Sequence, residues 1–133
     1  MTLILTRVAL GISGAILAGI GLSMLVVPLD FFAMNGVELP ADPSLLSEIT
    51  APGVALVLVG VLMLTGSIKL EFAKLGLVEG GLVYGSYGLS RVISMAFHGL
   101  PSDSLVTATV IELVVGVVLI GLSRVVGRGV RQN

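Results

Sequence analysis

Cysteine is absent from the chain, and histidine occurs only once, at His98. Without cysteine there is no disulfide, no thiolate metal site and no dithiol redox chemistry. A single histidine also excludes a haem held by two histidines of one chain. The sequence contains no nucleophile motif, phosphate-binding loop or metal-ligand spacing either. We therefore predict no metal, no cofactor and no enzymatic activity.

Charged residues are scarce as well. They make up 11% of the 133 residues, compared with roughly a quarter in soluble domains. Hydrophobic residues account for 56% of the chain, and the mean hydropathy is +1.14. This composition predicts an integral membrane protein. The net charge of −1 leaves no basic surface, so nucleic acid is not a predicted partner.

The apolar residues fall into four segments, which predict a single all-α domain over 1–133, an integral membrane bundle of four transmembrane helices. A bilayer is crossed by about 20 apolar residues. Pro28 is expected to end the first helix, and Asp42 followed by Pro43 is typical of an N-cap and the first helical position. We expect a loop with a short interfacial turn between them. The predicted helices cover about 5–27, 43–67, 71–98 and 104–125.

The basic residues outside the apolar segments predict the orientation. They precede the first helix, separate the second from the third, or follow the fourth, and the other two connections have none. The positive-inside rule then places both termini in the cytoplasm. These residues are Arg7, Lys69, Lys74, Arg124, Arg128 and Arg131.

Small residues recur every three or four positions along one side of the first helix. Such a face allows another backbone to approach closely in a membrane. We expect it to make the closest helix contacts, either within the chain or with another subunit. The residues are Gly11, Gly14, Ala15, Ala18 and Gly19.

Arg91 and Glu112 are charges inside otherwise apolar segments. The short polar connection 99–104 lies midway between them, so two antiparallel helices bring them to the same depth. An unpaired charge at the centre of a bilayer costs roughly 2.5 to 3.5 kcal/mol. We therefore predict an ion pair, with Glu48 or a tyrosine accepting the remaining donors of the guanidinium. One hypothesis is that this pair only fixes the helix register.

Further polar residues share the helical face of Arg91, and Pro52 in the second helix frees the carbonyl of residue 48 beside a carboxylate. Headgroup contacts for Glu48 are the simpler interpretation. The other is a binding site in the outer half of the bundle. That predicted ligand-binding or buried polar cluster consists of Glu48, Tyr84, Tyr87, Arg91, His98 and Glu112.

Several polar motifs occur in a recognisable order: Asp42-Pro43-Ser44, Ser47 through Gly53, Tyr87-Gly88-Leu89-Ser90-Arg91, His98 through Ser102, and Ile111-Glu112-Leu113. With these motifs the chain resembles a bacterial membrane family catalogued as domain of unknown function 4345, which is distantly similar to DoxX-like four-helix proteins. The resemblance implies a four-helix bundle in the bacterial inner (plasma) membrane, and it picks out Glu48, Arg91 and Glu112. It implies no activity.

Two functions are therefore predicted. The first is a small multi-pass membrane protein that serves as a non-enzymatic accessory or structural subunit of a membrane complex. The second is a bundle or carrier that binds a small molecule, a quinone or a lipid at the polar cluster, because ionisable residues inside membranes are functional candidates. The predicted partners are the lipid bilayer, other membrane subunits or further copies of the chain, and a quinone or lipid.

Overall fold

The structure is a computed structural model that describes the backbone of residues 1–129 and the side chains of residues 1–126. This part of the chain is helical and contains no strand, which confirms the predicted all-α fold. The helices are α1 (Thr2–Val26), α2 (Pro28–Met34), α3 (Pro43–Ile68), the 3₁₀ turn η1 (Leu70–Phe72), α4 (Ala73–His98) and α5 (Asp103–Gly129).

Three of the helices, α1, α3 and α5, are long and apolar enough to span a membrane. The fourth long helix, α4, falls below that threshold in the described range, because its glycine, serine and tyrosine residues and Arg91 lower its hydropathy. The predicted count of four transmembrane helices is therefore not confirmed. The boundaries of the four long helices agree with the predicted ranges to within about one turn.

The connection predicted as a loop contains the helix α2. Pro28 occupies its first turn, where a missing N–H costs nothing. The Phe31 N–H donates to the Val27 carbonyl over 2.9 Å, so the chain turns directly from α1 into α2. Farther along, the Asp42 carboxylate accepts from the Leu45 N–H at 2.9 Å, which confirms the predicted cap of α3.

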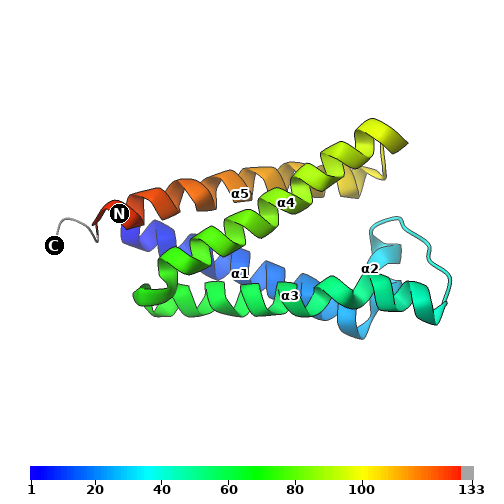
Figure 1. Cartoon of the computed structure of the whole chain (residues 1–133), viewed down its shortest axis with the longest axis horizontal. Coiled ribbons are helices and arrows are strands. Elements are labelled where there is room, and N and C mark those ends of the chain that lie inside the picture. Colours follow the sequence, from blue (N-terminus) through cyan, green and yellow to red (C-terminus); the bar gives the residue numbers. More distant parts are fainter. Residues whose placement is uncertain (130–133) are drawn as a thin grey trace.

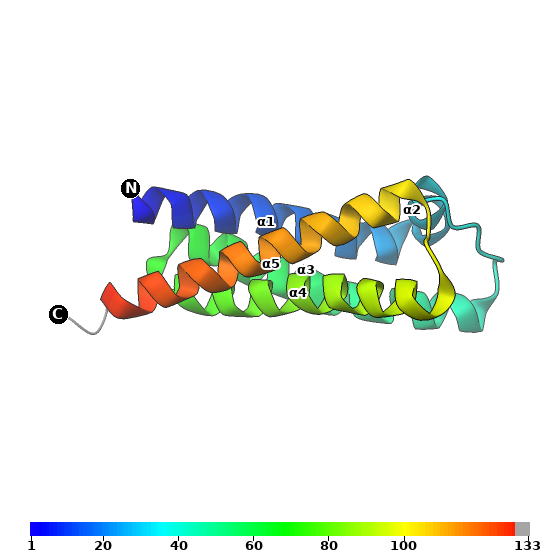
Figure 2. The same cartoon turned by 90° about the horizontal axis from the view of Figure 1, so that it is seen from above.

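The long helices form two closely packed pairs, α1 with α3 and α4 with α5, which are joined mainly through α3 and α4. The pairs lie close together where α1 begins and α5 ends, and they move apart towards the other end (Figure 1). We call these the narrow end and the wide end. Figure 2, turned by 90°, again places α2 at the wide end.

Small residues hold α1 against α3. A Cβ on Gly14 would lie 2.9 Å from the Gly60 carbonyl oxygen, and one on Gly60 would lie 2.6 Å from the Ala18 nitrogen. The predicted small-residue face is thus confirmed in part. Within the chain it does not extend to Ala15, which is exposed, or to Gly19, whose Cβ would meet nothing within 4 Å.

The narrow half of the bundle holds its apolar core, where Leu10, Met63, Leu77 and Leu119 are fully buried. One polar contact crosses between the two pairs above this core. The Tyr84 hydroxyl donates to the Ser13 carbonyl at 2.8 Å, and Tyr84 is only 5% exposed. The core therefore fixes the two pairs at the narrow end and leaves them apart at the wide end.

Candidate functional site

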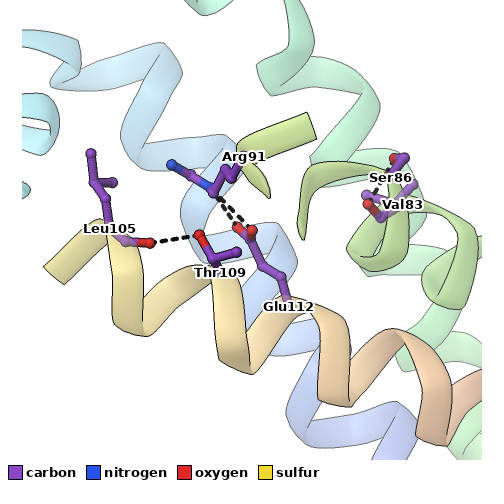
Figure 3. A network of polar contacts seen from close by, with 6 residues as sticks. All are labelled: Val83, Ser86, Arg91, Leu105, Thr109 and Glu112. Atoms are coloured by element: carbon purple, nitrogen blue, oxygen red, sulfur yellow. Dashed lines mark hydrogen bonds and ion pairs between the residues drawn. The ribbon is translucent and has the colours of Figure 1, made fainter. Parts of the chain in front are cut away.

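Arg91 of α4 and Glu112 of α5 contact one another (Figure 3). The Arg91 Nε–H points to both carboxylate oxygens, at 3.0 Å from Oε2 and 3.3 Å from Oε1. The Glu112 side chain is 14% exposed and that of Arg91 is 32% exposed. The predicted ion pair is therefore confirmed, and it is the one salt bridge among the side chains that the structure describes.

The seam between α4 and α5 explains why the pair forms. A Cβ on Gly88 would lie 2.8 Å from the Leu113 side chain, and one on Gly116 would lie 2.9 Å from the Gly85 nitrogen. Without side chains at these glycines the two helices approach closely on the narrow side of the ion pair. Thr109, one turn from Glu112, donates to the Leu105 carbonyl of its own helix and so does not compete for the carboxylate.

The ion pair lies in the wall of a cavity of about 430 Å³ between the two helix pairs. The remaining walls are mostly apolar and come from α1, α2 and α3. Their residues include Leu17, Ile20, Met24, Phe31, Phe32 and Leu56. A concave, mostly apolar space with a few polar groups on one side is the usual form of a small-molecule site.

The structure brings four of the six predicted cluster residues to this cavity: Tyr84, Tyr87, Arg91 and Glu112. Glu48 is exposed on α3, outside the cavity, and α3 continues as a helix through Pro52. His98 is exposed at the end of α4, with its Nδ1 3.1 Å from the Ser94 carbonyl oxygen. Within the described residues, neither Glu48 nor a tyrosine accepts from the guanidinium, contrary to expectation.

The cavity walls from α1 and α2 were not predicted. Ile20 and Met24 belong to a helix that is apolar on all sides, so its sequence does not indicate which side chains face the cavity. Phe31 and Phe32 could have been recognised, because two aromatic residues in a short connection indicate that the connection packs against another apolar surface. In the structure they pack against the core and face the cavity from the wide end.

The wide end is closed by a hydrogen-bonded connection, here called the latch, which consists of Asn35, Ser102 and Ser104. The Asn35 carbonyl oxygen accepts from the Ser102 hydroxyl at 2.7 Å and from the Ser104 hydroxyl at 3.1 Å. These bonds tie the end of α2 to the connection between α4 and α5. The cavity is therefore covered by protein on the side of the loops.

The side chains that line the cavity are suited to binding a ligand. Arginine and tyrosine offer hydrogen-bond donors, and the carboxylate is already occupied by Arg91. In the part of the chain that the structure describes, no three histidine, cysteine, aspartate or glutamate side chains come together as metal ligands.

Residues 5–126 match a protein family described as Domain of unknown function (DUF4345). Neither a curated protein nor a solved structure matches the chain. The match covers all four long helices and the cavity between them.

Proposed function

The chain belongs to the family described as Domain of unknown function (DUF4345), which assigns no activity, and we propose that it is a membrane protein that binds an apolar small molecule between its helices. The cavity is the observation that carries this proposal. Its volume of about 430 Å³ falls within the range of roughly 300 to 1,000 Å³ for small-molecule sites. A bundle that served only as a scaffold has no need to keep this space open, since close packing of apolar side chains stabilises a fold.

The proposal includes four membrane crossings, with α4 as the fourth. Its 26 residues extend about 39 Å at 1.5 Å per residue, enough for a hydrocarbon core of about 30 Å. Its glycines pack against α3 and α5, and its guanidinium is paired with Glu112, so the charge in its outer half is compensated by protein. We place the narrow end in the cytoplasm of a bacterial cell and the wide end outside.

Filling the cavity tests the proposal. Ala108 lines it from α5, so Ala108→Phe should exclude a bound molecule. Ala55 on α3 is exposed, and Ala55→Phe serves as the matched control. Native mass spectrometry of protein released from its own membrane should show a retained small molecule in the parent and the control, and none in Ala108→Phe. Identical spectra for all three proteins would contradict the proposal.

A second candidate function, an accessory subunit, is favoured by a groove on the seam of α4 and α5. The groove is lined by Gly81, Gly85, Gly116 and Gly121, and a Cβ on Gly85 or Gly121 would meet nothing within 4 Å. Small residues on a lipid-facing surface let another helix dock closely. Gly121→Leu should then reduce the size of the detergent-solubilised assembly, whereas Gly19→Leu, at another open position, should not. An unchanged size in both variants argues against this function.

A further inference from the structure

The polar wall of the cavity offers donors that the protein does not use. Arg91 reaches Glu112 through Nε alone, although a guanidinium has five N–H donors. Its terminal nitrogens turn away from Glu112 (Figure 3), and no hydrogen bond within the described residues involves them. Tyr87 also lines the cavity, and its hydroxyl has no hydrogen-bond partner in the described part of the chain. A molecule in the cavity therefore meets donors in need of acceptors.

The charges at this wall already balance, because Arg91 and Glu112 carry one positive and one negative charge. A ligand with an ionised head would add an uncompensated charge in a medium of low dielectric, and that is costly. An uncharged head with carbonyl oxygens supplies acceptors without adding charge. An amine would be repelled by the guanidinium and would bring donors where donors are in excess.

The shape of the cavity indicates where such a molecule enters. The latch closes the wide end by joining Asn35, at the end of α2, to the first turn of α5, and α5 otherwise packs mainly along α4. In Figure 1, α1 and α5 lie apart at the wide end. Ile16 of α1 and Ile111 of α5 both line the cavity and are 50% and 53% exposed. The cavity thus meets its surroundings between these two helices, across an apolar surface that faces lipid.

We infer that the ligand is an uncharged amphiphile with a carbonyl-bearing head, such as an ester or a ketone, which enters from the bilayer between α1 and α5. This inference rests on the proposed binding function and names its ligand class. Arg91 precedes the end of α4 by seven residues, or about 10 Å, so its donors lie below the headgroup layer. A carbonyl dissolved in the membrane finds no water there, and the Arg91 terminal nitrogens and the Tyr87 hydroxyl supply the missing hydrogen bonds.

Two tyrosines and no tryptophan occur in the chain, and both tyrosines line the cavity. Their fluorescence therefore reports on the cavity, and bromine atoms on a bound chain quench it. Three probes are compared on the protein in micelles: methyl dibromostearate, dibromostearate at a pH where it is ionised, and dibromo-octadecane. The ester should quench saturably, with an affinity about tenfold above those of the alkane and of the ionised acid, as one gained hydrogen bond would give.

Each outcome is decisive. Equal affinities of ester and alkane would overturn carbonyl recognition and leave the binding function standing, and tighter binding of the ionised acid would overturn the neutral head. No saturable quenching by any probe would overturn the binding function itself. The double variant Arg91→Gln with Glu112→Gln keeps an uncharged polar pair and should reduce the affinity of the ester to that of the alkane. An unchanged affinity would rule out Arg91 as the donor.

The entrance is tested separately in phosphatidylcholine vesicles. Because the chain has no cysteine, Ile16→Cys with Ile111→Cys can be bridged selectively by a short bis-maleimide. Bridging should slow quenching by methyl dibromostearate, whereas each single cysteine variant treated with the same reagent should not. Loosening the latch with Ser102→Ala and Ser104→Ala should leave the rate unchanged. Faster quenching in the latch variant, with no effect of the bridge, would place the entrance at the wide end instead.

Discussion

At the scale of single residues, the ion pair uses only a small part of what an arginine offers. One N–H is shared between two carboxylate oxygens, so the pair lacks the two parallel bonds of the strongest arginine–carboxylate contacts. The pair therefore positions α4 against α5 more than it stabilises them, and its main energetic role is to leave neither charge alone.

The first prediction follows from that role. Arg91→Leu or Glu112→Leu alone should lower the free energy of unfolding by about 2 to 3 kcal/mol, because each strands a charge. The double leucine variant should recover most of the loss. Unfolding in mixed micelles with increasing dodecyl sulfate measures all three, and single variants as stable as the parent would contradict this view.

Counting residues from the connection predicted the contact of Arg91 with Glu112, because depth along two antiparallel helices follows from helical rise alone. The same counting explains why His98 is absent from the cavity. It shares the helical face of Arg91 but lies about 10 Å farther along. Glu48 lies about 140° around α3 from the buried Gly53 at 100° per residue, so it points elsewhere. Which donors of a guanidinium remain unused depends on side-chain rotamers, which no sequence pattern fixes.

At the scale of helices, the sequence predicted where each long helix begins and ends. It did not predict which side of a helix packs against its neighbour. Long apolar segments and their caps fixed the four long helices to within about one turn. The helix α2 was not predicted, because its seven residues are too few to show the hydrophobic periodicity of a helix. On α1 the three- and four-residue spacings include Gly14 and Ala18 but also Ala15 and Gly19. Only the position of α3 decides that the first two are packed.

The second prediction uses two glycines of α1 as a matched pair. In Gly14→Ala the new Cβ would lie 2.9 Å from the Gly60 carbonyl oxygen, and backbone cannot rotate away, so stability should fall by about 1 to 3 kcal/mol. In Gly19→Ala the new Cβ has open space, so the higher helix propensity of alanine should leave stability equal or raise it by up to about 1 kcal/mol. The same unfolding assay compares them, and equal effects would contradict the packing described.

The third prediction concerns the latch. Ser102→Ala with Ser104→Ala removes two hydrogen bonds to the Asn35 carbonyl and should free the end of α2 without lowering the stability of the long helices. Hydrogen exchange of the α2 amides should become faster. Ser86→Ala is the control, because the Ser86 hydroxyl donates only to Val83 of its own helix. Unchanged exchange in α2 would show that packing of Phe31 and Phe32 alone holds it.

At the scale of the whole molecule, basic residues divide the two ends of the bundle. The described basic residues other than Arg91 belong to segments at the narrow end, together with Glu71 and Glu79, and the segments at the wide end carry the acidic residues Asp30, Glu38, Asp42 and Asp103. Arg131 and the side chain of Arg128 lie outside the described residues. This division supports the proposed orientation, because basic residues are retained on the cytoplasmic side. The sequence alone predicted the division, since it requires only the order of charges and spans.

The fourth prediction tests this orientation. A reporter that is active only after export should be inactive when fused after Asn133 and active when inserted after Glu38 in the connection at the wide end. Activity at Asn133 would reverse the orientation. Activity at both sites would mean that an odd number of helices crosses the membrane.

The separation of Arg91 from Glu112 by 21 residues also has a consequence for biosynthesis. At about 5 to 20 residues per second, the guanidinium leaves the ribosome roughly 1 to 4 s before the carboxylate that neutralises it. By then α1 and α3 are complete and carry the glycine contacts that join them. The helix α4 is too polar to enter lipid readily by itself, and Arg91, two turns from its end, adds to that cost. We therefore expect α4 to wait at the translocon until α5 emerges, so that the two enter the bilayer together as a hairpin.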